Sequence, residues 1–341
     1  MTSNLISIII PAYNSKDTLP ACLNSILNQK FNNFELILVD NGSTDATSAL
    51  CDGYRAKDPR VRVIHMKHDE IASAWNAGLE AATGRYIIFM DGADYIEEDC
   101  FDKFTDHLWQ DFDVIFMRAS EIHADGTKNV IPGFNTLAGQ SHNDVLQKFT
   151  DKLPDKTWDK LIRRRVLTEN NIQFTPGGLW EDVDFCMSLY LNATTYGVLA
   201  DVPCYCRTIR NTKRDPKEWC HKLILTLSKW TGEAELNYKE HNTIIHHWMA
   251  ALYCDELIPL YGKLPAAERK ALRYAMDDFA WLLDVRKTGS DRSKKSLYNL
   301  AGPWGASHAA TFKDSVKCLK SRLVCFCGIC KEAALSVGRK G

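Results

Sequence analysis

Four short runs dominated by apolar, often β-branched residues alternate with amphipathic stretches over the first ninety residues. The apolar runs cover residues 5–10, 34–39, 61–64 and 86–90. After the first run, apolar residues follow the spacing of a helix that is buried on one side, namely Leu19, Cys22, Leu23, Ile26 and Leu27. Two further amphipathic stretches, 43–54 and 70–82, complete a β-α-β-α-β-α-β order. This order predicts an α/β fold with a mostly parallel sheet that is flanked by helices.

The rest of the chain divides into a mixed stretch and a helical stretch. The mixed stretch predicts a helix at 101–109 and strands at 113–119 and 127–131. From Lys217 onward the apolar spacing predicts helices at 223–230, 244–260 and 268–283, with breaks at Gly232 and Pro259. We therefore expect two domains, an α/β domain of residues 1–210 and a helical region of residues 211–341.

Polar and aromatic side chains follow three of the predicted strands, at the sheet edge where open α/β folds bind ligands. These side chains belong to Tyr13 and Asn14, Asp40 and Asn41, and Asp91 and Asp94. An aromatic ring can stack on a base, and carboxylates can accept a base N–H, reach a ribose or hold a hard cation. The chain has neither a G-x-G-x-x-G motif after the first strand nor a Walker loop. The residues therefore favour a nucleotide-sugar site with a cation on the diphosphate, although each of them also suits an ordinary polar turn.

Four motifs resemble, in order and spacing, the N-terminal half of the family 2 glycosyltransferases. The motifs are Ile8-Ile-Ile-Pro-Ala-Tyr-Asn14, Val39-Asp-Asn-Gly-Ser-Thr-Asp45, Ser73-Ala-Trp-Asn-Ala-Gly78 and Met90-Asp-Gly-Ala-Asp94. The resemblance implies the GT-A fold and the inverting transfer of a sugar from a nucleotide donor. It assigns donor binding to Pro11, Tyr13, Asp40, Asn76 and Asp91, with Tyr13 and Asp40 on the base, usually uracil. It also implies that Mg²⁺ or Mn²⁺ is bound, here by Asp91 and Asp94.

Two positions depart from the family's pattern. The family usually carries Asp-x-Asp-Asp after the fourth strand, and the third position of that motif supplies the main metal ligand. Here that position is Ala93, whose methyl group cannot coordinate a hard cation. The second departure is Trp75, which stands where arginine is frequent, and it puts the phosphate contacts of that helix in question.

A second group of acidic residues opens a predicted helix after Gly177-Gly178. Acidic residues in a first helical turn are stabilised by the unpaired N–H groups there, so Glu181-Asp182 has a purely structural explanation. An ionised carboxylate that faces a cleft can also act as a general base. The stretch resembles the Glu-Asp motif of the same family, and this resemblance assigns the deprotonation of the acceptor hydroxyl to Asp182. Trp158 and Lys160 match a Trp-x-Lys-Leu pattern that precedes it.

Composition narrows the class of protein and its location. Charge is balanced, with 42 Lys and Arg against 43 Asp and Glu, so no nucleic-acid partner is expected. Twelve scattered cysteines, no signal-peptide pattern and no run of about 20 apolar residues favour a cytoplasmic protein with free thiols.

The segment 313–341 is basic and amphipathic. It holds seven Lys or Arg against two acidic residues, and its apolar residues repeat in steps of three and four. Two roles remain open for it: packing on the α/β domain or on another subunit of a homo-oligomer, or peripheral contact with an anionic membrane surface.

The sequence thus predicts an inverting glycosyltransferase of polysaccharide biosynthesis that is UDP-sugar dependent. Asp182 is its expected general base, and a glycan or a lipid-linked glycan is its expected acceptor. One alternative is a catalytically impaired nucleotide-sugar-binding protein, because Ala93 occupies the usual position of the metal ligand. A sugar nucleotidyltransferase is a further alternative, although Pro11-Ala-Tyr-Asn14 is unlike the Gly-rich, basic loop of that class.

Overall fold

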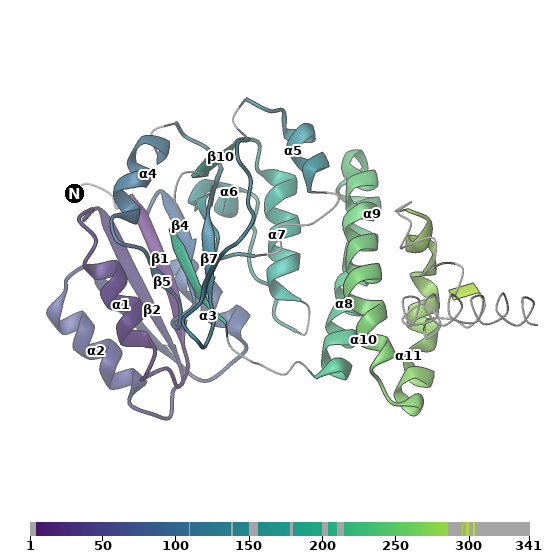
Figure 1. Cartoon of the computed structure of the whole chain (residues 1–341), viewed down its shortest axis with the longest axis horizontal. Helices are drawn as coiled ribbons and strands as arrows, with labels where there is room; N and C mark the ends of the chain where they lie inside the picture. Colours follow the sequence, from purple (N-terminus) through teal and green to yellow (C-terminus); the bar gives the residue numbers. More distant parts are fainter. Residues whose placement is uncertain are drawn as a thin grey trace, which may run out of the picture. The chain divides into compact units, whose positions relative to one another are not determined.

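The computed structural model describes residues 5–108, 110–137, 139–149, 156–177, 180–199, 204–209 and 215–285, together with residues 295, 298, 299 and 303. By its internal contacts the chain divides into two compact units (Figure 1). The first consists of residues 1–213 and 233–244, and the second of residues 214–232 and 245–341. The assignment of separate functions to residues 1–210 and 211–341 stays a prediction.

The first unit is built on a seven-stranded sheet of order β10-β6-β9-β4-β1-β2-β3. The strands are β1 (Ile6–Ala12), β2 (Phe34–Asn41), β3 (Val61–Met66), β4 (Tyr86–Phe89), β6 (Val114–Met117), β9 (Lys160–Arg163) and β10 (Tyr196–Leu199). All neighbouring strands are parallel except β9, which runs antiparallel to both β4 and β6. The side chains of β1, β2 and β4 are buried along their whole length, as expected of strands covered on both faces. The predicted α/β class with a mostly parallel sheet is therefore confirmed.

The helices of the first unit pack against this sheet or follow its strands. They are α1 (Leu19–Leu27), α2 (Thr47–Lys57), α3 (Ile71–Ala81), α4 (Cys100–Leu108), α5 (His142–Lys148), α6 (Arg164–Glu169) and α7 (Glu181–Asn192). Helix α3 packs closely on β1 and β2, because the absent side chain of Gly78 lets it approach. A Cβ atom at position 78 would lie 2.2 Å from the Cγ2 atom of Ile9. Helix α2 packs on β2 and β3.

The first unit also contains a second, four-stranded sheet of order β5-β11-β7-β8, and all four of its strands follow β4 in the sequence. Its strands are β5 (Tyr95–Ile96), β11 (Tyr205–Thr208), β7 (Ala119–Ile122) and β8 (Lys128–Val130). The strand expected at 113–119 is in fact two strands, since β6 ends at Met117 in the large sheet and β7 begins at Ala119 in the small one. At this division the chain passes from the large sheet to the small one.

The second unit consists of helices in its described residues. They are α8 (Pro216–Leu236), α9 (Asn242–Ala251), η2 (Leu252–Leu257), α10 (Ile258–Gly262), α11 (Ala266–Asp278) and η3 (Ala280–Asp284). The last turn of α8, the short η1 (Lys239–His241) and the first residues of α9 belong to the first unit. The predicted breaks at Gly232 and Pro259 are wrong. Helix α8 continues through Gly232, and Pro259 sits at the first turn of α10, directly after the π-helix η2, where a missing N–H is tolerated.

Two observations bear on contact with membranes. Among the residues that the structure describes, no helix is both long enough and apolar enough to cross a membrane. The amphipathic segment 313–341 lies outside the described residues. Its contact with a membrane surface or with another subunit therefore stays a prediction.

Candidate active site

The carboxyl ends of β4, β1 and β2 lie side by side, because these strands are neighbours in the parallel sheet. In the register of β1 and β2, Pro11 pairs with Val39 and Ala12 with Asp40. The residues at and just beyond these strand ends, from Tyr13, Asp40 and Asp91 onward, therefore gather at one edge of the sheet. The sequence predicted this grouping of motifs that are up to eighty residues apart.

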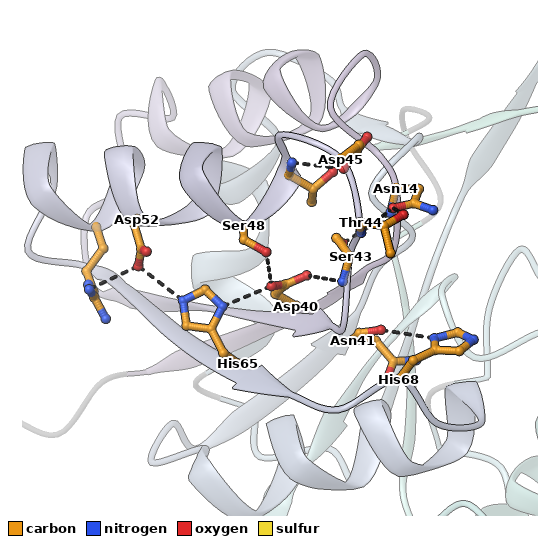
Figure 2. A network of polar contacts seen from close by, with 12 residues as sticks. Asn14, Asp40, Asn41, Ser43, Thr44, Asp45, Ser48, Asp52, His65 and His68 are labelled. Atoms are coloured by element: carbon orange, nitrogen blue, oxygen red, sulfur yellow. Dashed lines mark hydrogen bonds and ion pairs between the residues drawn. The ribbon is translucent and has the colours of Figure 1, made fainter.

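Asp40 is the most constrained carboxylate at this edge. Its residue is only 3% exposed, and Oδ1 accepts a hydrogen bond from the backbone N–H of Ser43 at 3.1 Å. Oδ2 accepts from the Ser48 hydroxyl and from Nδ1 of His65, the latter at 2.9 Å (Figure 2). Burial raises the pKa of Asp40, but the hydrogen bonds from Ser43, Ser48 and His65 outweigh this effect and hold its pKa below the usual range. Asp40 is therefore an oriented anion at neutral pH.

Tyr13 is exposed to 44% and stacks on His68, with ring centroids 4.2 Å apart and planes 22° apart. Nδ1 of His68 lies 3.0 Å from the backbone oxygen of Asn41, so that this nitrogen carries the proton and donates it (Figure 2). Sequence reasoning did not single out His68. Its position two residues after a strand was the one available signal, and a lone histidine there is not distinctive.

The turn after β4 holds Asp91 and Asp94 in different environments. Asp91 is half-buried, and its Oδ1 accepts from the N–H of Ala93 at 2.9 Å. Asp94 is only 3% exposed; its Oδ2 accepts from the Tyr205 hydroxyl at 2.6 Å and its Oδ1 from the N–H of Thr208 at 2.8 Å. Burial and the neighbouring charge of Asp94 raise the pKa of Tyr205, which keeps this phenol a hydrogen-bond donor. Asp94 thus ties the turn to strand β11.

The fit of a divalent cation depends on these two carboxylates. Among the described residues, no group of three or more His, Cys, Asp and Glu side chains could hold a metal ion. Mg²⁺ sites often use only one or two carboxylates together with substrate phosphates, and Asp91 satisfies that requirement. Asp94 is less suited, because both of its oxygens already accept hydrogen bonds within the protein. The assignment of metal binding to Asp91 and Asp94 stays a prediction.

Helix α3 connects this edge of the sheet to the segment before α7. The amide of Asn76 donates to the backbone oxygen of Phe174 at 2.7 Å and accepts from its N–H at 2.9 Å. Glu70, at the start of the same helix, accepts from the N–H of Gly177 at 2.7 Å. The predicted donor contact of Asn76 stays a prediction, and the structure gives its amide group a structural partner.

Trp75, the departure from the family's arginine, is an aromatic packing residue. Its ring meets Phe89 of β4 edge-on at 5.2 Å and stacks on Phe174 at 5.8 Å. Phe174 stacks in turn on Phe185 of α7, with centroids 4.2 Å apart and planes 7° apart. An apolar stack therefore links β4, α3 and α7 at this position.

Asp182 lies in the first turn of α7, as predicted, and is half-buried. Its Oδ1 accepts from the Thr157 hydroxyl at 3.0 Å. The two residues of the Trp-x-Lys-Leu pattern have different contacts. The ring of Trp158 stacks on that of Tyr205, with centroids 4.8 Å apart, whereas Lys160 is fully buried and donates a hydrogen bond to the backbone oxygen of Lys156. Lys160 is thus a structural residue of β9.

Comparisons with known proteins agree with this architecture. Residues 7–170 match the family model described as Glycosyl transferase family 2, and this part of the chain is a glycosyltransferase domain of that family. The chain is 30% identical over 203 residues to "Uncharacterized glycosyltransferase EpsJ" of Bacillus subtilis, with 56% of each chain covered. It is 26% identical over 271 residues to "Uncharacterized glycosyltransferase YibD" of Escherichia coli, covering 75% of this chain and 74% of the relative. The chain spans about half the length of EpsJ and of a second Bacillus subtilis relative, EpsH.

Solved structures show the same fold. The chain is similar to TarS 1–349 of S. aureus, which was determined in complex with UDP-GlcNAc, with a TM-score of 0.71 and 22% identity. The match covers 91% of this chain and 92% of TarS 1–349. The predicted GT-A type of architecture with a helical C-terminal region is therefore confirmed.

Proposed function

We propose that this chain is an inverting glycosyltransferase, which moves a sugar from a UDP-sugar to a hydroxyl group of a glycan or a lipid-linked glycan. The observation that carries the proposal is the gathering of Tyr13, Asp40 and Asp91 at the adjacent ends of β1, β2 and β4. The complex of TarS 1–349 with UDP-GlcNAc supports a uridine donor for a chain of this fold.

In this function the residues at the ends of β1 and β2 hold the nucleotide. The exposed ring of Tyr13 provides a stacking face for the base, and the buried Pro11 lies two residues before it, near the end of β1. The anion of Asp40, held in place by its hydrogen bonds, accepts a base N–H. Because the carboxylate is already oriented, little entropy is lost when the base binds.

The transfer step relies on Asp182. Its carboxylate takes the proton of the acceptor hydroxyl while the hydroxyl oxygen bonds to the anomeric carbon, and the bond to the diphosphate breaks on the opposite face. Inversion follows from this single displacement. Asp91 would hold Mg²⁺ or Mn²⁺, which when bound supplies positive charge to the departing diphosphate.

A second function, binding of a nucleotide sugar without transfer, is favoured by Ala93 and by the internal hydrogen bonds of Asp94. Both functions require the base subsite, so binding alone does not separate them. They differ in whether the removal of Asp182 has any effect on turnover.

The test uses binding and turnover together. UDP-GlcNAc, UDP-glucose and GDP-mannose are compared by calorimetry with and without Mn²⁺, and release of UDP is followed as slow donor hydrolysis, in which water replaces the acceptor. We expect binding of the UDP-sugars in preference to GDP-mannose. Asp182→Asn should keep the donor affinity and lower UDP release by about 10²–10⁴-fold, the usual contribution of a general base.

The matched control is Glu169→Gln, which neutralises an exposed carboxylate at the end of α6 and should change neither quantity. UDP-sugar binding without any UDP release would establish the non-transferring alternative. Absence of binding to all three nucleotide sugars would overturn both functions.

A further inference from the structure

His65 lies between two carboxylates beside the base subsite (Figure 2). Its Nδ1 is 2.9 Å from Oδ2 of Asp40, and its Nε2 is 3.2 Å from Oδ1 of Asp52. The pairing of β2 and β3 places Asp40 and His65 in register, and Asp52 comes from α2. The ring therefore connects Asp40, the proposed contact of the base, to a second and more exposed acid, Asp52.

The protonation state of the ring decides whether both contacts are hydrogen bonds. A neutral imidazole donates from one nitrogen only, so its other nitrogen would turn a lone pair toward a carboxylate. An imidazolium ion donates from both nitrogens and matches both acids. The geometry thus suits the charged form, which also offsets the buried negative charge of Asp40.

The other charged and titratable groups around His65 leave this bridge intact. On α2, Arg55 pairs with Asp52 at 3.0 Å, and burial together with the charges of Asp40 and Asp52 raises the pKa of the Cys51 thiol to about 12, so Cys51 stays neutral. On β2 and β3, Glu35 and Arg62 pair with each other at 2.9 Å. Helix α3, which also packs against β3, carries one charged residue, the exposed Glu80.

We propose that His65 is a positioning residue for Asp40 and that it makes donor binding depend on pH, with tighter binding while the imidazolium bridges Asp40 and Asp52. This inference rests on the proposed function, in which Asp40 accepts a base N–H. His65 and Ser48 both donate to Oδ2 of Asp40, while Ser43 donates to Oδ1. A neutral His65 keeps only one of its two donated hydrogen bonds and loses its charge, which leaves the Asp40 carboxylate less firmly oriented toward the base.

The direction of the pH effect follows from the shift of His65. The hydrogen bond to Asp40 and then the one to Asp52 raise the pKa of His65 above its ordinary value. The bridge is therefore complete below this raised pKa and is lost as the pH rises through it. We expect UDP-sugar affinity to fall about tenfold between about pH 5 and about pH 8. Tenfold corresponds to ~1.4 kcal/mol of binding free energy.

The experiment measures the Kd of UDP-glucose and UDP-GlcNAc for the full chain by calorimetry across this pH range. These donors are used instead of UDP because their diphosphate is a diester and has no ionisation in the range. His65→Gln keeps one neutral donor, so its affinity should be independent of pH and close to that of the unaltered chain at high pH. Asp52→Asn should keep the low-pH affinity but move the midpoint of the transition to lower pH, because one of the two acids is gone.

His221→Gln is the matched control, since His221 lies on α8 and is exposed, and its pH profile should equal that of the unaltered chain. The NMR titration of the His65 ring should share its midpoint with the change in Kd. An unchanged pH profile in His65→Gln, or an unmoved midpoint in Asp52→Asn, would overturn the role of His65 while leaving the proposed function standing. Absence of UDP-sugar binding at every pH would instead overturn the proposed function, and this inference with it.

Discussion

Replacement of Asn76 by alanine removes both hydrogen bonds between α3 and the backbone of Phe174. Phe174 is 1% exposed, and a net contribution of about 0.5–1.5 kcal/mol for each bond gives a loss of about 1–3 kcal/mol. Asn76 lines an open pocket of about 660 Å³ between α3 and α6, so water can reach part of the vacated site. The loss should therefore stay within this range instead of rising to the full cost of two buried, unpaired groups.

The assay that isolates this effect is hydrogen exchange of the segment 171–177. A loss of about 1–3 kcal/mol should speed exchange there by roughly 5- to 150-fold, since each 1.4 kcal/mol corresponds to a factor of ten. Lys57→Ala, at the exposed end of α2 and outside this pocket, is the matched control and should leave the exchange of this segment unchanged. UDP release should fall as well, because the segment precedes Asp182 on α7.

Donor affinity separates this structural role from the contact that the family resemblance assigns to Asn76. Because both amide atoms already serve the Phe174 backbone, Asn76→Ala should change the Kd of UDP-GlcNAc by no more than about twofold, less than the ~1 kcal/mol of one hydrogen bond. Large loss of donor affinity with unaltered exchange in residues 171–177 would refute the reasoning.

Three further substitutions test the packing and the turn after β4. Gly78→Ala should lower the free energy of unfolding, measured by urea denaturation, by about 1–3 kcal/mol, because the new methyl group would lie 2.2 Å from a side-chain carbon of β1. An unchanged free energy of unfolding would mean that α3 can shift outward. Ala93→Asp should tighten Mn²⁺ binding in calorimetry and increase UDP release with Mn²⁺, since it adds an oxygen ligand. Equal UDP release with and without the substitution would show that Asp91 is sufficient to bind the cation. Tyr205→Phe should cost about 1.5–3 kcal/mol by thermal or urea unfolding, because it removes a donor from the buried Asp94; unchanged stability would show that water replaces the phenol.

The sequence predicted the strands that are continuous and apolar better than those that depend on distant partners. The runs 5–10, 34–39, 61–64 and 86–90 correspond to β1, β2, β3 and β4, whose burial leaves a clear apolar pattern. Strands β9, β10 and β11 have four residues each and were not predicted. Strand β9, for example, lies between β4 and β6 in the large sheet, and only the pairing of segments more than forty residues apart defines it as a strand.

The candidate site shows the same limit. Motif spacing located Tyr13, Asp40 and Asp91 because each lies within three residues of the end of a predicted strand. It did not locate His65 or Tyr205, although both contact residues of those motifs. Their relevance comes from pairing across strands, Asp40 with His65 in β2 and β3, and from a hydrogen bond across more than a hundred residues to Asp94. Such partners require the register of the sheets, which one sequence does not supply.

Two asparagine side chains make the same kind of connection, one to a residue just before α3 and one from within α3, and together they join the base subsite to the segment before the proposed general base. Asn41, at the end of β2, donates to the backbone oxygen of Asp69 at 2.8 Å and accepts from its N–H at 3.1 Å. Asn76 repeats this two-way contact with Phe174, in the segment that leads toward Asp182. A side-chain amide that satisfies both backbone groups of one residue fixes position and orientation at once. Helix α3 is therefore held at its start by the strand that carries the base contact, and it holds in turn the segment before α7. Substitution of Asn41 should accordingly alter donor binding, and substitution of Asn76 should alter transfer with little change in donor affinity, even where the substituted side chain touches neither substrate.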